Sequence, residues 1–200
     1  MNKTIVLATS NANKLIEVKE VLSPLGFEVL SLKDLSLKQT APEDGLTFVD
    51  NARIKAEDIA SLCSYPVLSD DSGLCIEALD GFPGVHSARF MEGMDYKLKN
   101  QAIIEKMKGI TDRRAYFACA MVYIDKKNGI DKAFEAHSEG EITLEVDPNP
   151  ISGFGYDPIF YSYELKKTFG QASMEEKDKV SHRGKALLQV VEYLKGIYHE

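Results

Sequence analysis

The start of the chain changes from a strand-like to a helical pattern of apolar positions. Residues 4–8 form a short apolar run, too short for a helix, and residues 9–11 are good helix-capping types. The following helix should end near Pro24 and Gly26, before a second strand over residues 27–30. Its buried face is predicted to comprise Leu15, Val18, Val21, Leu22 and Leu25.

Two further helices are predicted by a capping residue followed by a helical stripe. Thr47 precedes one stripe and Asp95 precedes the other. The first apolar face is predicted to comprise Phe48, Ala52, Ala56, Ile59 and Ala60. The second is predicted to comprise Leu98, Ala102 and Met107.

The centre of the chain predicts an antiparallel meander. Residues 115–124 form the longest strand candidate, and Asn128-Gly129 is a hairpin signal before residues 133–137. Residues 141–146 are expected to add a third strand.

Two helices are predicted near the end of the chain. Ser173 and Glu176 have capping-box spacing, so a short helix should begin there. The final helix is predicted to bury Leu187, Val190, Val191 and Leu194. The element order therefore predicts an α/β fold, a single domain over residues 1–200 with a mixed central β-sheet flanked by helices.

Composition limits the function classes. A net charge of −7 disfavours nucleic-acid partners, whose phosphates need a basic face, but allows a small anion in a local basic pocket. The three cysteines are widely spaced without a CxxC pair, which predicts reduced core residues. The chain shows neither a secretory h-region nor a run of roughly 18 apolar residues, so we expect a cytoplasmic protein without a membrane partner.

An acidic pair follows the apolar run at residues 66–68. Asp70 and Asp71 are predicted to end a strand, on a rigid support from which carboxylates can hold a divalent metal ion. The alternative is a solvated turn, because Asp, Ser and Gly are ordinary turn residues.

Residues 9–14 lie where the first strand becomes a helix. The unpaired backbone N–H groups at a helix start can bind an anion, and Lys14 adds a full positive charge. The alternative is a capped helix with a solvated lysine.

Glu43 and Lys55 lie on either side of the next predicted helix start. Glu43 can supply a second metal ligand, whereas Lys55 lies two turns inside the helix. The alternative is two solvated charges.

Residues 153–158 resemble a dinucleotide-binding glycine motif only superficially, because Pro158 prevents a helix from following directly. Phe154 and Tyr156 can instead present ring faces to a planar base, while Asp157 offers acceptors. Buried loop aromatics are the alternative.

The last helix begins with the potential cations His182, Arg183 and Lys185. Cations at a helix N-terminus are mildly unfavourable. The arrangement therefore hints at an anion or a base carbonyl as ligand.

In this order, the blocks TSNANK, EDGLTFVDNARIKA, SDDSGLCIEALDGFPGVHSARF, GFGYDPIF and EEKDKVSHRGKAL resemble the inosine/xanthosine triphosphate pyrophosphatase family. The resemblance implies an elongated, two-lobed α/β molecule with a central nucleotide-binding cleft. It also implies a Mg²⁺-dependent homodimer that hydrolyses non-canonical purine nucleoside triphosphates (ITP, dITP and XTP) to the monophosphate and pyrophosphate.

The resemblance also implies roles for individual residues. Asp71 would be the proton acceptor and a metal ligand, and Glu43 the other metal ligand. With Asp71, the predicted catalytic residues are Lys14 and Lys55, which would neutralise phosphate charge. The residues implied around the triphosphate are Thr9, Ser10, Asn11, Ala12, Asn13, Lys14 and Ser72. The residues implied around the nucleoside and its base are Phe154, Gly155, Tyr156, Asp157, Lys177, His182 and Arg183.

Two other functions remain open. One is a pyrophosphatase of the septum-formation inhibitor type, which has a related architecture and acts on other nucleotides, including modified pyrimidines. The other is a catalytically silent nucleotide-binding regulator. The intact Lys14, Glu43 and Asp71 argue against the regulator.

Overall fold

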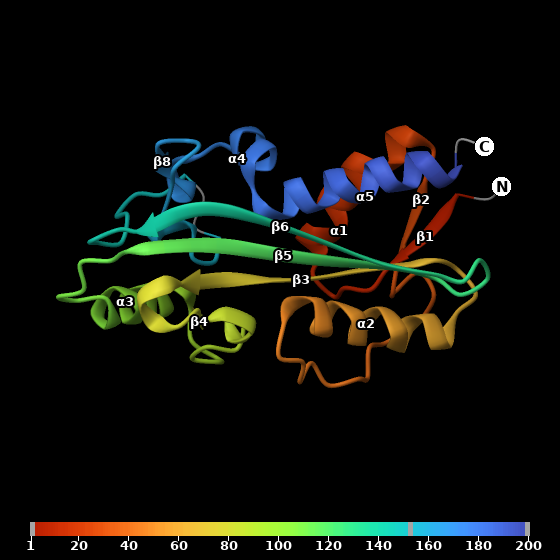
Figure 1. Ribbon diagram of the computed structural model, residues 1–200, viewed down its shortest axis with the longest axis horizontal. Coiled ribbons are helices and arrows are strands. Elements are labelled where there is room, and N and C mark those ends of the chain that lie inside the picture. The colour runs from red at the N-terminus through yellow and green to blue at the C-terminus, as the bar shows by residue number, and fades with distance from the viewer. Residues whose placement is uncertain (1–2, 152–153, 199–200) are drawn as a thin grey trace. The chain divides into compact units, whose positions relative to one another are not determined.

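The computed structural model describes residues 3–151 and 154–198, which form a mixed β-sheet with helices (Figure 1). The strand order is β2-β1-β3-β5-β6-β7-β8, with β4 paired to β3. The strands are β1 (Thr4–Leu7), β2 (Glu28–Ser31), β3 (Val67–Ile76), β4 (Phe82–Pro83), β5 (Arg114–Asp125), β6 (Ile130–Ile142), β7 (Phe160–Ser162) and β8 (Lys167–Thr168). The α-helices are α1 (Ala12–Leu22), α2 (Phe48–Leu62), α3 (Tyr96–Lys106), α4 (Met174–Val180) and α5 (His182–Tyr198). The predicted α/β class with a mixed sheet is confirmed.

The chain forms two compact units. Unit 1 comprises residues 1–71, 119–135 and 186–200, and unit 2 comprises residues 72–118 and 136–185. The single domain over residues 1–200 and the cleft implied by the resemblance stay predictions.

The core of unit 1 lies on two faces of the sheet. β1 pairs in parallel with both β2 and β3, and α2 and α1 lie on opposite faces of these strands (Figure 1). Thr47 caps α2 through a capping box with Asp50, and the predicted apolar face of α2 packs into the core. On α1, Val18 and Leu22 are buried, but Val21 is 36% exposed, so its prediction as a core residue is wrong.

The core of unit 2 gathers aromatic and aliphatic side chains from β5, β7 and α3. Asp95 caps α3 as predicted, accepting a hydrogen bond from the backbone N–H of Leu98. Leu98 itself is 50% exposed, contrary to the prediction. Met107, just after α3, is buried as predicted, but within the helix the buried stripe runs through Lys99 and Ile103, one residue further around than Leu98 and Ala102.

Two strand predictions are wrong in extent. β3 does not end at the acidic pair but continues to Ile76, ten residues in all, because β4 pairs with it at Cys75 and Ile76. The predicted third strand over residues 141–146 is absent in the described structure, since β6 runs without a break to Ile142 and pairs with β7 instead.

Other sequence expectations have simple outcomes. The hairpin at Asn128-Gly129, the capping box of Ser173 with Glu176 and the buried stripe of α5 are confirmed. Cys75 and Cys119 are buried, Cys63 is partly buried, and all three cysteines are free of disulfides. No helix in the described ranges has the length and apolar character needed to cross a bilayer.

Arg113 links the segment after α3 to the end of β6 by donating hydrogen bonds to their backbone carbonyls. Its Nε lies 2.7 Å from the Ile142 oxygen, and its Nη1 and Nη2 lie 3.0 and 2.5 Å from the Met107 and Thr143 oxygens. We expect Arg113→Met to lower the free energy of unfolding by about 2–3 kcal/mol, because hydrogen bonds from a charged donor are lost. Urea denaturation measures the change.

The neighbouring Arg114 provides the matched control. Its exposed side chain forms an ion pair with the nearby Asp112 at 2.7 Å, so Arg114→Met should leave the urea midpoint almost unchanged. Equal midpoints for the two variants would contradict the role given to Arg113.

Candidate active site

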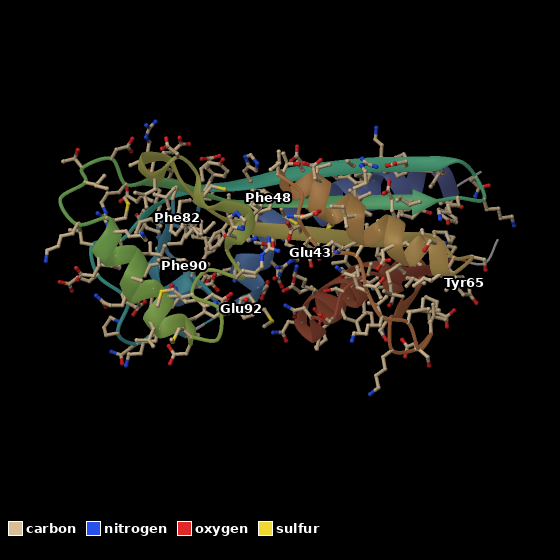
Figure 2. All side chains as sticks on the ribbon, turned by 90° about the horizontal axis from the view of Figure 1, so that it is seen from below. Glu43, Phe48, Tyr65, Phe82, Phe90 and Glu92 are labelled. Carbon is tan, nitrogen blue, oxygen red and sulfur yellow. The ribbon has the colours of Figure 1, made fainter. Side chains whose placement is uncertain are left out.

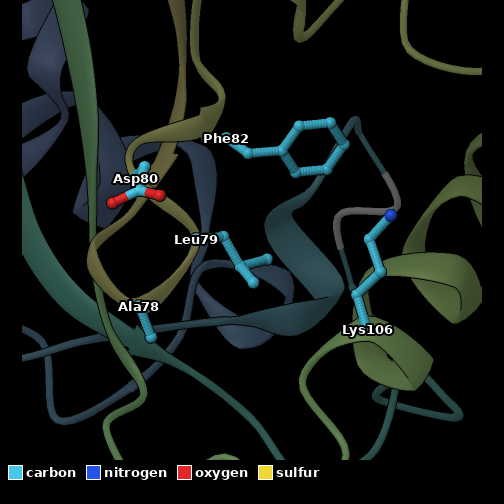
Figure 3. A pocket seen from close by; sticks show the side chains of 5 residues that line it. All are labelled: Ala78, Leu79, Asp80, Phe82 and Lys106. Carbon is cyan, nitrogen blue, oxygen red and sulfur yellow. The ribbon is translucent and has the colours of Figure 1, made fainter.

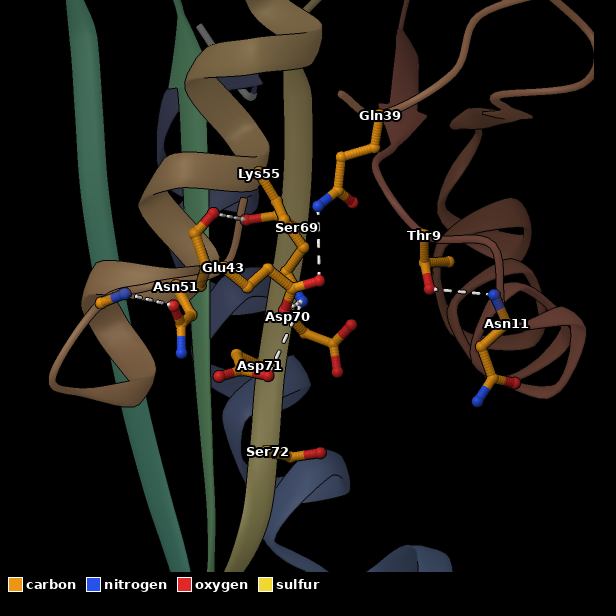
Figure 4. A network of polar contacts seen from close by, with 12 residues as sticks. Thr9, Asn11, Gln39, Glu43, Asn51, Lys55, Ser69, Asp70, Asp71 and Ser72 are labelled. Carbon is orange, nitrogen blue, oxygen red and sulfur yellow. Dashed lines mark hydrogen bonds and ion pairs between the residues drawn. The ribbon is translucent and has the colours of Figure 1, made fainter. Parts of the chain in front are cut away.

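Five charged residues of unit 1 form a carboxylate–lysine cluster of Lys14, Glu43, Lys55, Asp70 and Asp71. Figure 4 labels all of them except Lys14. Lys14 Nζ lies 2.7 Å from Asp70 Oδ2. Lys55 Nζ lies 3.2 Å from Glu43 Oε2 and 3.7 Å from Asp71 Oδ1. The predicted metal ligands and catalytic lysines therefore come together in one unit.

The strand geometry explains how two adjacent acids serve different partners. Successive side chains of a strand point to opposite faces of the sheet, so Asp70 meets Lys14 of α1 while Asp71 meets Lys55 of α2. β1 pairs with β3 at Val67 and Leu68 and ends there. The acids therefore lie just beyond the end of a neighbouring strand, although β3 itself continues.

Burial and charge shift the pKa values in this cluster. Burial alone would lower the pKa of Lys55, but the carboxylates of Asp70, Asp71 and Glu43 raise it above its usual value. Burial raises the pKa of Asp71, against the opposing effect of Lys55 and Lys14. Lys55 is thus an ammonium at neutral pH, and Asp71 holds a proton more tightly than an exposed aspartate.

The cluster fits a divalent cation that is shared with phosphate. Within residues 3–151 and 154–198, no three His, Cys, Asp or Glu side chains could hold a metal ion by themselves. Asp71 Oδ2 is buried without a hydrogen-bond partner in that part of the chain. Mg²⁺ is commonly bound by one or two carboxylates together with water and substrate phosphates, so Glu43 and Asp71 suit such an ion.

The turn before α1 combines a helix cap with an exposed helix start. Asn11 Oδ1 accepts hydrogen bonds from the backbone N–H groups of Asn13 and Lys14, and Thr9 Oγ1 accepts one from Asn11. The alternative of a capped helix is confirmed, but Lys14 is paired with Asp70 rather than solvated. Exposed side chains here are those of Ser10, Ala12 and Asn13. Phosphate binding by this turn stays a prediction.

In unit 2, the predicted base-binding residue Lys177 contacts two others of the same set, Asp157 and Phe154. Its Nζ lies 2.5 Å from Asp157 Oδ2 and 5.6 Å from the ring centroids of both Phe154 and Phe169. Asp157 is buried, whereas Phe154 is 47% exposed. An exposed ring beside an ammonium can present one face to a planar ligand.

The start of α5 places two more predicted residues. His182 is buried and stacks on Phe117, with ring centroids 4.8 Å apart and an interplanar angle of 11°. Arg183 Nη2 lies 3.5 Å from Ser72 Oγ, so these two predicted residues are neighbours. Lys185 pairs with Glu164 and donates to the His137 carbonyl. Of the three potential cations predicted here, Lys185 therefore forms an ion pair at the protein surface.

Tyr156 differs from its prediction. It is only 4% exposed, its hydroxyl donates to the Ser87 carbonyl at 2.6 Å, and its ring packs edge-to-face with Tyr96. Burial raises its pKa. The ring is therefore buried rather than accessible, in line with the alternative of a buried loop aromatic, while the place of Tyr156 around the nucleoside stays a prediction. Gly153 lies outside the described residues.

Three amide side chains were missed by sequence reasoning. Gln39 Nε2 lies 3.3 Å from Glu43 Oε1, Asn51 Oδ1 accepts from the Gly45 backbone, and Asn100 donates to the Gly155 carbonyl. For Asn51 a signal existed, because it lies four residues before Lys55 and hence on the same helix face. Asn100 pairs with a residue far along the chain and leaves no local sequence signal, and Gln39 lies only four residues before Glu43 but outside any helix or strand.

A separate pocket in unit 2 contains none of the predicted site residues (Figure 3). It is lined by Ala78, Leu79, Asp80, Phe82 and Lys106. Phe82 forms an edge-to-face pair with Phe90 at a centroid distance of 5.1 Å (Figure 2).

The fold and these clusters define a mixed α/β protein that carries a partly buried carboxylate–lysine site. The family model described as the Ham1 family matches residues 5–193, and the chain belongs to this family. A relative from Leptospira interrogans called "dITP/XTP pyrophosphatase" is 43% identical over 197 residues, covering 98% of each chain.

Two solved structures support the same relationship. The Ham1 protein of Staphylococcus aureus has a TM-score of 0.89 and 35% identity, covering 97% of this chain and 99% of its own. A HAM1 protein from Coxiella burnetii has a TM-score of 0.90 and 36% identity, covering 96% and 98%. The family relationship expected from the sequence is therefore confirmed.

Proposed function

We propose that the chain hydrolyses the non-canonical purine nucleoside triphosphates ITP, dITP and XTP to the nucleoside monophosphate and pyrophosphate. Such an activity removes these nucleotides before they enter DNA or RNA. The observation that carries the proposal is the carboxylate–lysine cluster of a Ham1-family chain whose relatives are called dITP/XTP pyrophosphatases. We further propose a cytoplasmic homodimer that uses Mg²⁺.

The carboxylate–lysine cluster supplies the charges that this reaction needs. A triphosphate carries close to four negative charges, which the ammonium groups of Lys14 and Lys55 partly neutralise. Bound Mg²⁺, held by Glu43 and Asp71, would supply further positive charge to the phosphates. Charge developing on the leaving pyrophosphate is stabilised in the same way.

Asp71 acts as the proton acceptor in the proposed mechanism. As water attacks the α-phosphorus, its oxygen forms the new P–O bond and Asp71 takes the proton that it loses. The bond between the α-phosphorus and the bridging oxygen breaks, and the electron pair leaves with pyrophosphate. The raised pKa of Asp71 strengthens it as a base once it is ionised.

Base selection is assigned to residues of unit 2. The 6-oxo group of hypoxanthine and xanthine accepts hydrogen bonds, whereas the adenine amino group donates. The Arg183 guanidinium can only donate, so adenine would leave a donor unpaired at a cost of about 1–3 kcal/mol. The exposed Phe154 ring is proposed to stack on the base.

Separate incubations with Mg²⁺ and ITP, XTP, dITP, ATP, GTP, dTTP or UTP test the proposal. We expect ITP, XTP and dITP to be cleaved fastest, with equal amounts of monophosphate and pyrophosphate measured. Faster cleavage of pyrimidine nucleotides would instead indicate the septum-formation inhibitor type. Orthophosphate release would contradict attack at the α-phosphorus, and tight binding of ITP without turnover would indicate a regulator.

A further inference from the structure

Asn51 is a buried amide beside the carboxylate–lysine cluster. It lies on α2 one turn before Lys55 and on the same helix face, with no exposed surface. Its Oδ1 accepts a hydrogen bond from the Gly45 backbone N–H at 2.9 Å (Figure 4). Its Nδ2 is buried and has no hydrogen-bond partner in the described part of the chain.

The Oδ1 contact fixes the segment that carries Glu43. A Cβ atom added at Gly45 would lie 2.6 Å from Asp50 Cβ and 2.8 Å from Asn51 Oδ1, so this backbone packs tightly against the start of α2. Two residues earlier, Glu43 contacts Lys55. Asn51 therefore ties the position of Glu43 to the helix that carries Lys55.

The Nδ2 atom, in contrast to Oδ1, lacks a partner among the described residues. A buried donor without a partner is costly and uncommon, so a role for this atom is expected. An amide NH₂ group can only donate, so the missing partner must be an acceptor. Asp71 Oδ2 is likewise buried without a partner among the described residues, so the two atoms do not satisfy each other. Unfilled hydrogen-bonding positions on the side chains that border this cluster indicate a polar ligand.

We propose that Asn51 is a substrate-binding and positioning residue, whose Nδ2 donates to a phosphoryl oxygen of the triphosphate while its Oδ1 holds Gly45. The inference rests on the proposed function, which brings an oxygen-rich anion to the neighbouring lysines. It adds a neutral donor to a site otherwise made of charged groups. A neutral amide can orient the phosphoryl group without changing the charge of the cluster.

Asn51→Asp separates the two roles, because it retains the Oδ1 acceptor for Gly45 and removes the donor. We expect its Tm to fall, because a carboxylate at this fully buried position is unfavourable, so binding is compared at a temperature where the variant is folded. There, Kd for inorganic tripolyphosphate, measured by calorimetry with Mg²⁺, should rise about 10- to 100-fold. KM for ITP should rise with it. Wild-type affinity for tripolyphosphate in Asn51→Asp would overturn the proposal.

The added charge of Asn51→Asp needs its own control. Asn51→Leu removes the donor without adding charge and should also weaken tripolyphosphate binding at a temperature where it is folded. If it does not fold, the smaller neutral variant Asn51→Ala takes its place, because salt screens repulsion at a buried position only weakly. A loss of affinity in a neutral variant supports the missing donor, whereas wild-type affinity in that variant overturns it.

The unmodified protein distinguishes failure of this inference from failure of the proposed function. Tripolyphosphate binding without hydrolysis of ITP would contradict the proposed function while the calorimetry still decides the role of Asn51. Absence of tripolyphosphate binding by the unmodified protein would overturn the inference for Asn51.

Discussion

Asp71→Asn is expected to lower kcat for pyrophosphate release from ITP by about 100- to 10,000-fold, the usual contribution of a positioned proton acceptor. The amide cannot take the proton from the attacking water, and it is also a poorer ligand for a cation. Nucleotide binding should persist, because Lys14 and Lys55 remain. Steady-state kinetics of pyrophosphate release and calorimetric titration with ITP measure the two effects.

A loss of folding stability should not account for the lower kcat of Asp71→Asn. The raised pKa of Asp71 means that the folded state disfavours its ionised form, so stability from this group grows as the pH falls through that pKa. At neutral pH a neutral amide removes this unfavourable term, and we expect a Tm no lower than that of the unmodified protein. The matched control is Asp44→Asn, an exposed acid next to Glu43, which should retain near-normal kcat. Near-normal turnover in Asp71→Asn would remove Asp71 from the mechanism.

Gly184→Ala is expected to cause a large loss of stability. A Cβ atom at Gly184 would lie 2.0 Å from the Asp178 backbone oxygen and 3.1 Å from Ser181 Oγ. The close atom belongs to backbone and cannot rotate aside, so α4 and the start of α5 must move apart. We expect the free energy of unfolding to fall by about 3 kcal/mol, at the upper end for overpacking, as measured by urea denaturation.

The same helix offers a control for this substitution. Gly196 also lies in α5, and a Cβ atom there would meet nothing within 4 Å. Gly196→Ala should stabilise the protein by about 0.5–1 kcal/mol, because alanine favours the helix. If both variants lost stability equally, contact with Asp178 could not be the cause.

For Gly184→Ala we also expect weaker ITP binding, because His182 and Arg183 would shift.

Sequence patterns predicted those features that depend on neighbouring residues. Helix caps at Thr47, Asp95 and Ser173 were predicted because a capping side chain and the backbone that it caps lie within three residues of each other. The acids and lysines of the site were also identified. Their pairing was not, because Lys14 and Asp70 meet only through the parallel pairing of β1 with β3.

The wrong predictions share a tertiary cause. Ser, Asp and Gly favour turns, yet they continue β3 because β4 pairs with its far end. An accessible ring was expected for Tyr156 because it lies in a glycine-flanked loop, but its hydroxyl donates to the Ser87 carbonyl inside unit 2 and the ring is buried. Leu98 shows the limit of helical periodicity, since a stripe one residue over matches the spacing equally well.

The opposed directions of Asp70 and Asp71 have an electrostatic consequence. With all its members ionised, the cluster holds three carboxylates against two ammonium groups and has one net negative charge. A bare polyphosphate would therefore meet mild repulsion, and at Lys14 it would share the ammonium group with Asp70. A polyphosphate that arrives with its own counter-cation avoids this repulsion, so the cluster favours ion-complexed nucleotides over free ones.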